Sequence, residues 1–186
     1  LLALSPESGE VKAWVGSIHH KYFQYDHVRA RRQSGSAFKP LLYAAALEGG
    51  VRPCDWRRNR LTTWTEWDEW TPRNAGDEYG GSYSIQGALV HSVNTIAVEL
   101  LMETGIGPVK EMAEKAGITS PIPYEPSIAL GTAEVSLLEL AAAYASFARE
   151  GRRVRPWYIR SIRDAEGRLL YRFENPNMEN SDQIMS

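Results

Sequence analysis

The sequence contains very little cysteine. Its 186 residues include a single cysteine, Cys54, so the chain cannot form an internal disulfide bond. It also has no cysteine cluster of the kind that binds zinc. This scarcity does not identify a cellular compartment, because many exported proteins also lack disulfides. Cysteine chemistry is therefore excluded as the organising feature of the chain.

Long apolar runs and a strong net charge are also missing. No apolar stretch approaches the roughly 20 residues that a membrane-spanning helix needs, and the first residues do not resemble a signal peptide. The chain begins directly in a predicted strand, from which we infer that it was cut from a longer one. Its formal net charge is -2, with arginines scattered among acidic residues, so nucleic acid is not an expected partner. The length suits one globular domain with a sizeable core.

Metal ligands are sparse as well. His19, His20 and His27 lie close together in the sequence, but no carboxylate or cysteine stands at a spacing that would complete a metal site. Surface histidines explain this group better than ligands do. We therefore expect neither a metal ion nor another cofactor.

The hydrophobic pattern predicts both strands and helices. The apolar runs 1–4 and 11–15 flank a turn-rich segment and predict an opening β-hairpin, and 157–162 with 168–173 predict a closing one. Helices are predicted to begin near four residues: Ser36, Thr95, Pro108 and Leu137. The last of these follows a capping-box pattern, Ser136 with Glu139. We expect an α+β fold in which both hairpins join one antiparallel sheet and the helices pack beside it.

Two segments depart from this pattern. Residues 51–81 have few aliphatic side chains and predict an excursion from the core. Trp64, Trp67 and Trp70 could line a groove that stacks on sugar rings, but we favour packing onto the domain, because tryptophan is most often partly buried. Residues 175–186 are polar, and we predict a frayed or linking tail.

Ser36 and Lys39 form an S-x-x-K pair at the start of the predicted helix that follows Gly35. Three residues apart on one helical face, the lysine would lie close enough to take the serine's hydroxyl proton. A serine activated in this way can attack a carbonyl group and carry an acyl group. The alternative is a capping serine beside a solvated lysine, and on these residues alone both interpretations stay open.

Ser92 and Asn94 form a second polar pair, between a short helix predicted at 84–90 and a longer one that ends near Gly105. In a loop, residues two apart can both face one cleft, whereas on a continuous helix they would diverge. Residues of these types also cap helices well. Both interpretations can hold together.

The order and separation of Ser36-Ala37-Phe38-Lys39 and Ser92-Val93-Asn94 resemble the first two of three motifs in penicillin-binding proteins and serine β-lactamases. Further stretches resemble the transpeptidase domain of class A, bifunctional penicillin-binding proteins: 5–11, 32–40, 70–74, and 127–131 followed by 134–136. The similarity covers nearly the whole chain. It is much more specific than either motif alone.

This resemblance implies a D,D-transpeptidase that cross-links peptidoglycan and is a target of β-lactam antibiotics. Ser36 would attack the D-Ala-D-Ala end of a stem peptide and form an acyl-enzyme, which the amine of a second stem would accept. Lys39 would take up the proton, which requires a pKa below the ordinary value of about 10.4. Ser92 would relay protons, and Asn94 would hold the substrate amide and help to keep Lys39 in place. The backbone amide of Ser36 would contribute to the oxyanion hole.

The resemblance also implies a parent protein with a glycosyltransferase domain, anchored to the cytoplasmic membrane. The transpeptidase domain would lie on the periplasmic or extracytoplasmic side. These are expectations for the parent protein, not for the 186 residues alone.

One feature of the family is missing. Its third motif, Lys-Thr/Ser-Gly, lies on a strand after the region that matches 141–173, and no such tripeptide occurs in this chain. We therefore expect the front part of a transpeptidase domain, which alone binds β-lactams poorly or not at all. The exposed sheet edge left behind would favour self-association with a second copy.

Two other functions compete with the transpeptidase. A serine β-lactamase would share Ser36 and Lys39 but needs a group that activates water for deacylation, and Glu134 is the nearest candidate in the sequence. A non-catalytic penicillin-binding sensor or binding module would have kept the fold and lost turnover. The presence of all four polar residues favours the enzyme.

Overall fold

We describe a computed structural model of the chain, which covers residues 1–175, 177 and 182–186. These residues divide into two compact units that interleave along the sequence. The first unit comprises Leu1–Arg31, Lys115–Thr119 and Ser136–Ser186, and the second comprises Arg32–Glu114 and Ser120–Val135. All four residues of the predicted site, Ser36, Lys39, Ser92 and Asn94, belong to the second unit.

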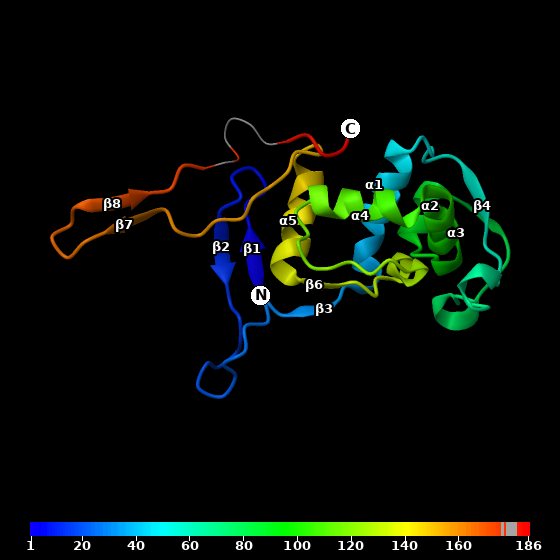
Figure 1. The fold of residues 1–186 in the computed structure, drawn as a ribbon, viewed down its shortest axis with the longest axis horizontal. Helices are drawn as coiled ribbons and strands as arrows, with labels where there is room; N and C mark the ends of the chain where they lie inside the picture. The colour runs from blue at the N-terminus through cyan, green and yellow to red at the C-terminus, as the bar shows by residue number, and fades with distance from the viewer. Residues whose placement is uncertain (176, 178–181) are drawn as a thin grey trace. The chain divides into compact units, whose positions relative to one another are not determined.

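The second unit is built mainly from helices, and their bounds are these: α1 (Lys39–Glu48), α2 (Ile85–Val90), α3 (Asn94–Thr104) and α4 (Ile106–Lys115), whose last residue passes into the first unit. Short 3₁₀ helices occur at η1 (Gly35–Phe38), η2 (Thr65–Trp67), η3 (Ala75–Asp77) and η4 (Pro126–Leu130). Helices α1 and α3 lie side by side, and η4 packs against both (Figure 1). The helices predicted from the sequence are confirmed, but η4 falls where only a proline-rich loop was expected.

Apolar side chains explain why these helices pack together. The large side chains that are completely buried include Phe38, Leu41, Leu42, Ile96, Leu100, Leu101 and Ile128. Full burial of such side chains is worth about 1.5–3 kcal/mol each. Pro40 falls in the first turn of α1, where its missing N–H costs no helical hydrogen bond. The core of the second unit therefore lies directly behind the Ser36–Lys39 turn.

The described strands form four separate two-stranded sheets. In the second unit, β4 (Trp56–Arg58) pairs antiparallel with β5 (Ser82–Ser84), which closes the base of the 51–81 excursion. Strand β3 (Arg31–Gln33) pairs with β6 (Glu134–Ser136). Composition did not predict β3 or β4, because three-residue strands carry too little alternation to be recognised.

The first unit contains both predicted hairpins. Strand β1 (Leu2–Leu4) pairs antiparallel with β2 (Val11–Trp14), and β7 (Ser161–Arg163) pairs antiparallel with β8 (Leu169–Arg172). The two hairpins do not share one sheet, so that part of the prediction is wrong. They are joined by a single parallel bridge between Glu10 and Trp157. All side chains of β7 and β8 are exposed, so no buried face aligns this hairpin with the first one.

Helix α5 (Leu137–Ala148) completes the first unit and begins with the predicted capping box. The Ser136 hydroxyl accepts a hydrogen bond from the Glu139 backbone N–H at 3.2 Å, and the Glu139 carboxylate accepts one from the Ser136 N–H at 2.8 Å. The buried side chains of α5 are small, namely Ala142, Ala143, Ala145 and Ser146. This composition permits the close packing that the sequence predicted.

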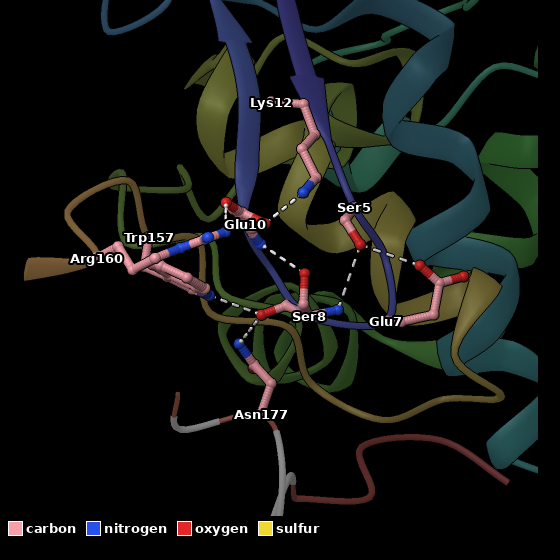
Figure 2. A network of polar contacts seen from close by, with 8 residues as sticks. All are labelled: Ser5, Glu7, Ser8, Glu10, Lys12, Trp157, Arg160 and Asn177. Atoms are coloured by element: carbon pink, nitrogen blue, oxygen red, sulfur yellow. Dashed lines mark hydrogen bonds and ion pairs between the residues drawn. The ribbon is translucent and has the colours of Figure 1, made fainter. Parts of the chain in front are cut away.

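Polar contacts connect the end of the chain to the opening hairpin within the first unit (Figure 2). The carbonyl oxygen of Ser8 accepts hydrogen bonds from Trp157 Nε1 at 2.8 Å and from Asn177 Nδ2 at 3.0 Å. Arg160 and Lys12 both pair with Glu10. The predicted frayed tail falls partly on residues 176 and 178–181, which lie outside the described residues. Of its described residues, Asn177 and Ile184 are buried.

Within the described part of the chain, none of the helices has the length and apolar character required to span a bilayer.

Candidate active site

Ser36 lies in the 3₁₀ turn that leads into α1, and its side chain is exposed. The neighbouring Ser34 holds this turn in place, since its backbone N–H donates to the Ala133 carbonyl at 3.2 Å. Gly35 donates to the carbonyl of Gly131 at 2.9 Å. Gly131 has φ +79°, and a Cβ there would overlap the carbonyl of Gly35, so this approach requires glycine. The serine is thus presented to solvent on a fixed backbone.

Lys39, one turn later, points into the protein and is only 1% exposed. Its Nζ donates three hydrogen bonds to neutral oxygens, at 2.7 Å to the Ser92 carbonyl, 2.9 Å to Ser92 Oγ and 2.7 Å to Asn94 Oδ1. Burial lowers the pKa of Lys39 to about 8, because desolvation disfavours the ammonium form. Lys39 is therefore a buried amine with a lowered pKa, not a solvated side chain.

Ser92 connects Lys39 to Ser36. Its Oγ donates a hydrogen bond to Ser36 Oγ at 3.0 Å while it accepts the bond from Lys39. Ser92 adopts φ 53°, a left-handed conformation that is uncommon for a residue other than glycine and typical of functional turns. The predicted direct contact between Ser36 and Lys39 is thus replaced by a path through the Ser92 hydroxyl.

Asn94 is the first residue of α3 and faces the same cluster. Its Oδ1 accepts from Lys39, and its Nδ2 donates to the Arg73 carbonyl at 2.9 Å. The interpretation of Ser92 and Asn94 as caps of α3 is wrong, because the N-cap residue is Val93 and makes no side-chain cap bond. Both side chains are directed at the lysine instead, so the four predicted residues form one connected group.

Three residues that sequence reasoning missed support this group. Asn74 Oδ1 accepts from the backbone N–H groups of Asn94 and Thr95 at 2.9 and 3.1 Å. Asn59 Oδ1 accepts from Asn74 Nδ2 at 2.7 Å and from Thr95 Oγ1 at 2.9 Å. Asn59 and Thr95 are both buried. Polar residues in a segment with few aliphatics were a signal, but nothing in their spacing pointed to α3.

Trp64, Trp67 and Trp70 are each partly buried, in agreement with the packing interpretation, whereas Trp56 in the same excursion is exposed. Trp64 and Trp70 form an isolated antiparallel bridge, which closes a small loop. Trp67 and Trp70 also line a cavity of about 530 Å³ together with Glu66, Asp68, Glu125, Pro126 and Ser127. The alternative interpretation, that these aromatics line a groove, thus also has support.

The remaining candidates lie outside the cluster. Glu134, the water activator required by the β-lactamase alternative, lies in β6 with an exposed side chain, and the hydroxyl and amine of the S-x-x-K pair make their contacts with Ser92 and Asn94. Among the described residues, no three or more His, Cys, Asp or Glu side chains converge as a metal site would require.

The chemistry available to this arrangement is nucleophilic. An exposed hydroxyl is connected through a second hydroxyl to a buried amine of lowered pKa, so a proton can leave the nucleophile without a histidine or a metal ion. The side-chain amide of Asn94 accepts a further hydrogen bond from the amine of Lys39. This combination suits acyl transfer to and from a serine.

Comparison with known proteins agrees with this chemistry. The family model described as "Penicillin binding protein transpeptidase domain" matches residues 1–185. The chain is 37% identical over 174 residues to penicillin-binding protein 1A of Aquifex aeolicus, which covers 91% of this chain and 24% of that protein. It spans about a quarter of the length of the curated relatives it matches.

Solved structures of the same kind share the fold. Penicillin-binding protein 1A from Haemophilus influenzae superimposes with a TM-score of 0.86 at 28% identity, over 92% of this chain and 26% of that one. PonA1 from Mycobacterium tuberculosis, in complex with penicillin V, gives a TM-score of 0.85 at 26% identity, over 99% of this chain and 50% of that one. The predicted α+β transpeptidase fold is therefore confirmed.

Proposed function

Because the chain belongs to the penicillin-binding protein transpeptidase family, we propose that it carries the nucleophilic half of a peptidoglycan D,D-transpeptidase site. The observation that supports this proposal most directly is the hydrogen-bonded path from Ser36 through Ser92 to Lys39, with Asn94 on the far side of the amine. The substrates are stem peptides ending in D-Ala-D-Ala, and β-lactams act on the same serine.

The first half-reaction forms the acyl-enzyme. Ser36 Oγ attacks the carbonyl carbon of the penultimate D-alanine, its proton passes to Ser92 Oγ, and the Ser92 proton passes to Lys39 Nζ. The backbone N–H of Ser36 supplies one donor to the oxyanion. When the amide C–N bond breaks, the nitrogen of the leaving D-alanine takes the proton of Ser92 Oγ, and Lys39 Nζ returns a proton to Ser92. The products are free D-alanine and an ester on Ser36.

In the second half-reaction, an amine of another stem peptide attacks this ester. Lys39, now neutral again, accepts the proton that the amine loses, and Ser36 regains its hydroxyl proton as the new amide forms. Asn94, which bonds Lys39 and the Arg73 carbonyl, would also hold the backbone amide of the substrate. Each step uses the same four residues, so the site needs no cofactor.

The lowered pKa of Lys39 makes this chemistry practical. With a pKa of about 8, roughly a tenth of the side chains are neutral at pH 7, against well under a thousandth for an ordinary lysine with a pKa near 10.4. A general base works best when its pKa lies near the operating pH. Burial of the amine thus supplies more than a hundredfold more of the reactive form.

The length of the relatives supports a wider setting. We place this chain in a membrane-anchored parent protein with a glycosyltransferase domain, its transpeptidase part on the extracytoplasmic side. The missing Lys-Thr/Ser-Gly strand would complete the cleft, so the 186 residues alone bind β-lactams weakly or not at all. Pairing of two copies along a strand edge stays a prediction, and its measure is sedimentation as a function of concentration.

The test is acylation by benzylpenicillin, followed by intact mass spectrometry. The 186-residue chain is compared with a longer natural polypeptide that includes any residues encoded after Ser186, each with and without Ser36→Ala. We expect one stable penicilloyl adduct on Ser36 of the longer polypeptide, none on its Ala variant, and little or none on the 186-residue chain.

Other outcomes would overturn particular parts of the proposal. Rapid stoichiometric acylation of the 186-residue chain would refute the incomplete cleft, and an unmodified longer polypeptide would refute the transpeptidase. Fast release of hydrolysed β-lactam would instead establish the β-lactamase alternative. An unchanged biological role after Ser36→Ala would establish the non-catalytic sensor.

A further inference from the structure

Helix α3 begins without a cap from its own neighbourhood. The first N–H groups of a helix have no partner within it and are usually satisfied by a side chain just before the first turn. Here the N-cap residue is Val93, which cannot do this. The Oδ1 atom of Asn74, twenty residues earlier in the chain, accepts from both Asn94 N and Thr95 N. The excursion therefore supplies the cap.

The amide of Asn74 can be oriented in only one way. Its Nδ2 donates to Asn59 Oδ1 at 2.7 Å and to the Glu78 carbonyl at 2.8 Å. Both partners are acceptors, so the nitrogen must face them and the oxygen must face α3. Asn59 is 6% exposed and accepts a further hydrogen bond from Thr95 Oγ1. The buried Asn59 side chain thus fixes the orientation of the Asn74 amide, with its oxygen toward α3.

The residue before Asn74 completes the arrangement. The carbonyl of Arg73 accepts from Asn94 Nδ2, which leaves Asn94 Oδ1 to face Lys39. One dipeptide, Arg73-Asn74, therefore holds both the backbone and the side-chain amide of Asn94. Pro72, directly before it, is buried and restricts its own backbone.

We propose that Asn74 is a positioning residue of the site, which fixes the first turn of α3 and so keeps the Asn94 amide oxygen on the amine of Lys39. The catalytic consequence rests on the proposed function, but the geometric claim does not. A purely structural cap would stabilise α3 without any effect on Lys39.

The test is an NMR titration of the five lysines with ¹³C at Cε, in the 186-residue chain. Wild-type Lys39 should titrate near pH 8. In Asn74→Ala, Asn94 loses its anchor, the ammonium loses an acceptor while its burial by α1 remains, and its pKa should fall by half a unit or more. Asn74→Asp keeps an acceptor oxygen toward α3 but turns its other oxygen toward Asn59 Oδ1 and the Glu78 carbonyl, so the Asn59 amide must rotate to donate to it. Because the cap is kept and the added negative charge favours the ammonium form, the Lys39 pKa should stay at or above that of the wild type.

The matched control is Ser136→Ala, which removes a helix cap from α5 without touching the site. This variant should leave the Lys39 pKa unchanged. An unchanged or raised pKa in Asn74→Ala, in a sample whose amide spectrum remains folded, would overturn the proposal. If Asn74→Ala does not fold, a lowered pKa in Asn74→Asp would overturn it instead.

A second measurement separates this inference from the proposed function. In the longer natural polypeptide, Asn74→Ala should slow acylation of Ser36 by benzylpenicillin by roughly tenfold to a hundredfold, since small misplacements of catalytic groups cost this much. Asn74→Asp should restore most of the rate, and an unchanged rate in Asn74→Ala would overturn the catalytic part. If the wild type is not acylated at all, the proposed function fails while the titration still decides the role of Asn74.

Discussion

The first backbone N–H groups of helices α3 and α5 find their hydrogen-bond acceptors in different ways. The first turn of α5 is satisfied by Ser136 and Glu139, three residues apart. The first turn of α3 depends on Asn74, which lies 20 residues before Asn94 in the 51–81 excursion. The local cap from Ser136 and Glu139 stabilises α5 alone. The cap from Asn74 also connects the excursion to α3, the helix that carries Asn94.

This difference suggests why the excursion is there. Asn59, Asn74 and Arg73 all contribute to the setting of Asn94, and the β4–β5 pair closes the base of the segment that contains them. A local serine cap could hold α3, but it would leave the Asn94 side chain without its second anchor. We infer that the 51–81 segment serves the site through these contacts.

The largest loss of stability should come from replacing Asn59, the buried residue that orients Asn74. Asn59→Leu deprives Thr95 Oγ1 and Asn74 Nδ2 of a shared acceptor, and buried groups left without partners cost about 1–3 kcal/mol each. We expect a loss of about 3 kcal/mol in the free energy of unfolding, measured in urea.

The control for Asn59→Leu is Thr63→Ala. It removes an exposed hydrogen bond to Thr71 in the same excursion and should cost less than about 0.5 kcal/mol. Equal losses in the two variants would show that the network around Asn59 has no special role.

A smaller effect should appear in the pH dependence of stability. The folded pKa of Lys39, about 8, lies below the unfolded value near 10.4, so above pH 8 the unfolded chain holds a proton that the folded chain has released. Stability must then rise with pH in this window. We expect the wild type to gain about 1.5 kcal/mol relative to Lys39→Met between pH 8 and pH 9.5. Parallel stability curves for the two proteins would contradict the buried amine.

Much of the fold could be predicted because it depends on local patterns. The helices follow from apolar periodicity with glycine stops, and the two hairpins follow from apolar runs around turns. Whether the two hairpins share one sheet could not be predicted, because it depends on whether β7 and β8 bury one face. The side chains on both faces of this hairpin are exposed. Three-residue strands such as β3 and β4 are formed by their partners, not by their own sequence.

The site divides in the same way. Ser36, Lys39, Ser92 and Asn94 were found through motif spacing and resemblance, and the structure brings all four together. A relay through Ser92 was expected from the resemblance, but its hydrogen bonds to both Ser36 and Lys39 were not, because a three-residue spacing suggests direct contact between Ser36 and Lys39. Asn59 and Asn74 were missed because their partners are about 20 to 36 residues away, a distance over which a single sequence carries no pattern.

The smallest effect is expected when the local cap of α5 is removed. Ser136→Ala removes the hydroxyl that accepts from Glu139 N, and loss of a serine N-cap typically costs about 1 kcal/mol. The backbone bond from Ser136 N to the Glu139 carboxylate remains, which limits the loss. Urea unfolding should therefore shift by about this amount, with Lys39 titrating as in the wild type. A change at Lys39 in this variant would mean that a local cap reaches the site as effectively as the distant one, and the distinction between α3 and α5 would disappear.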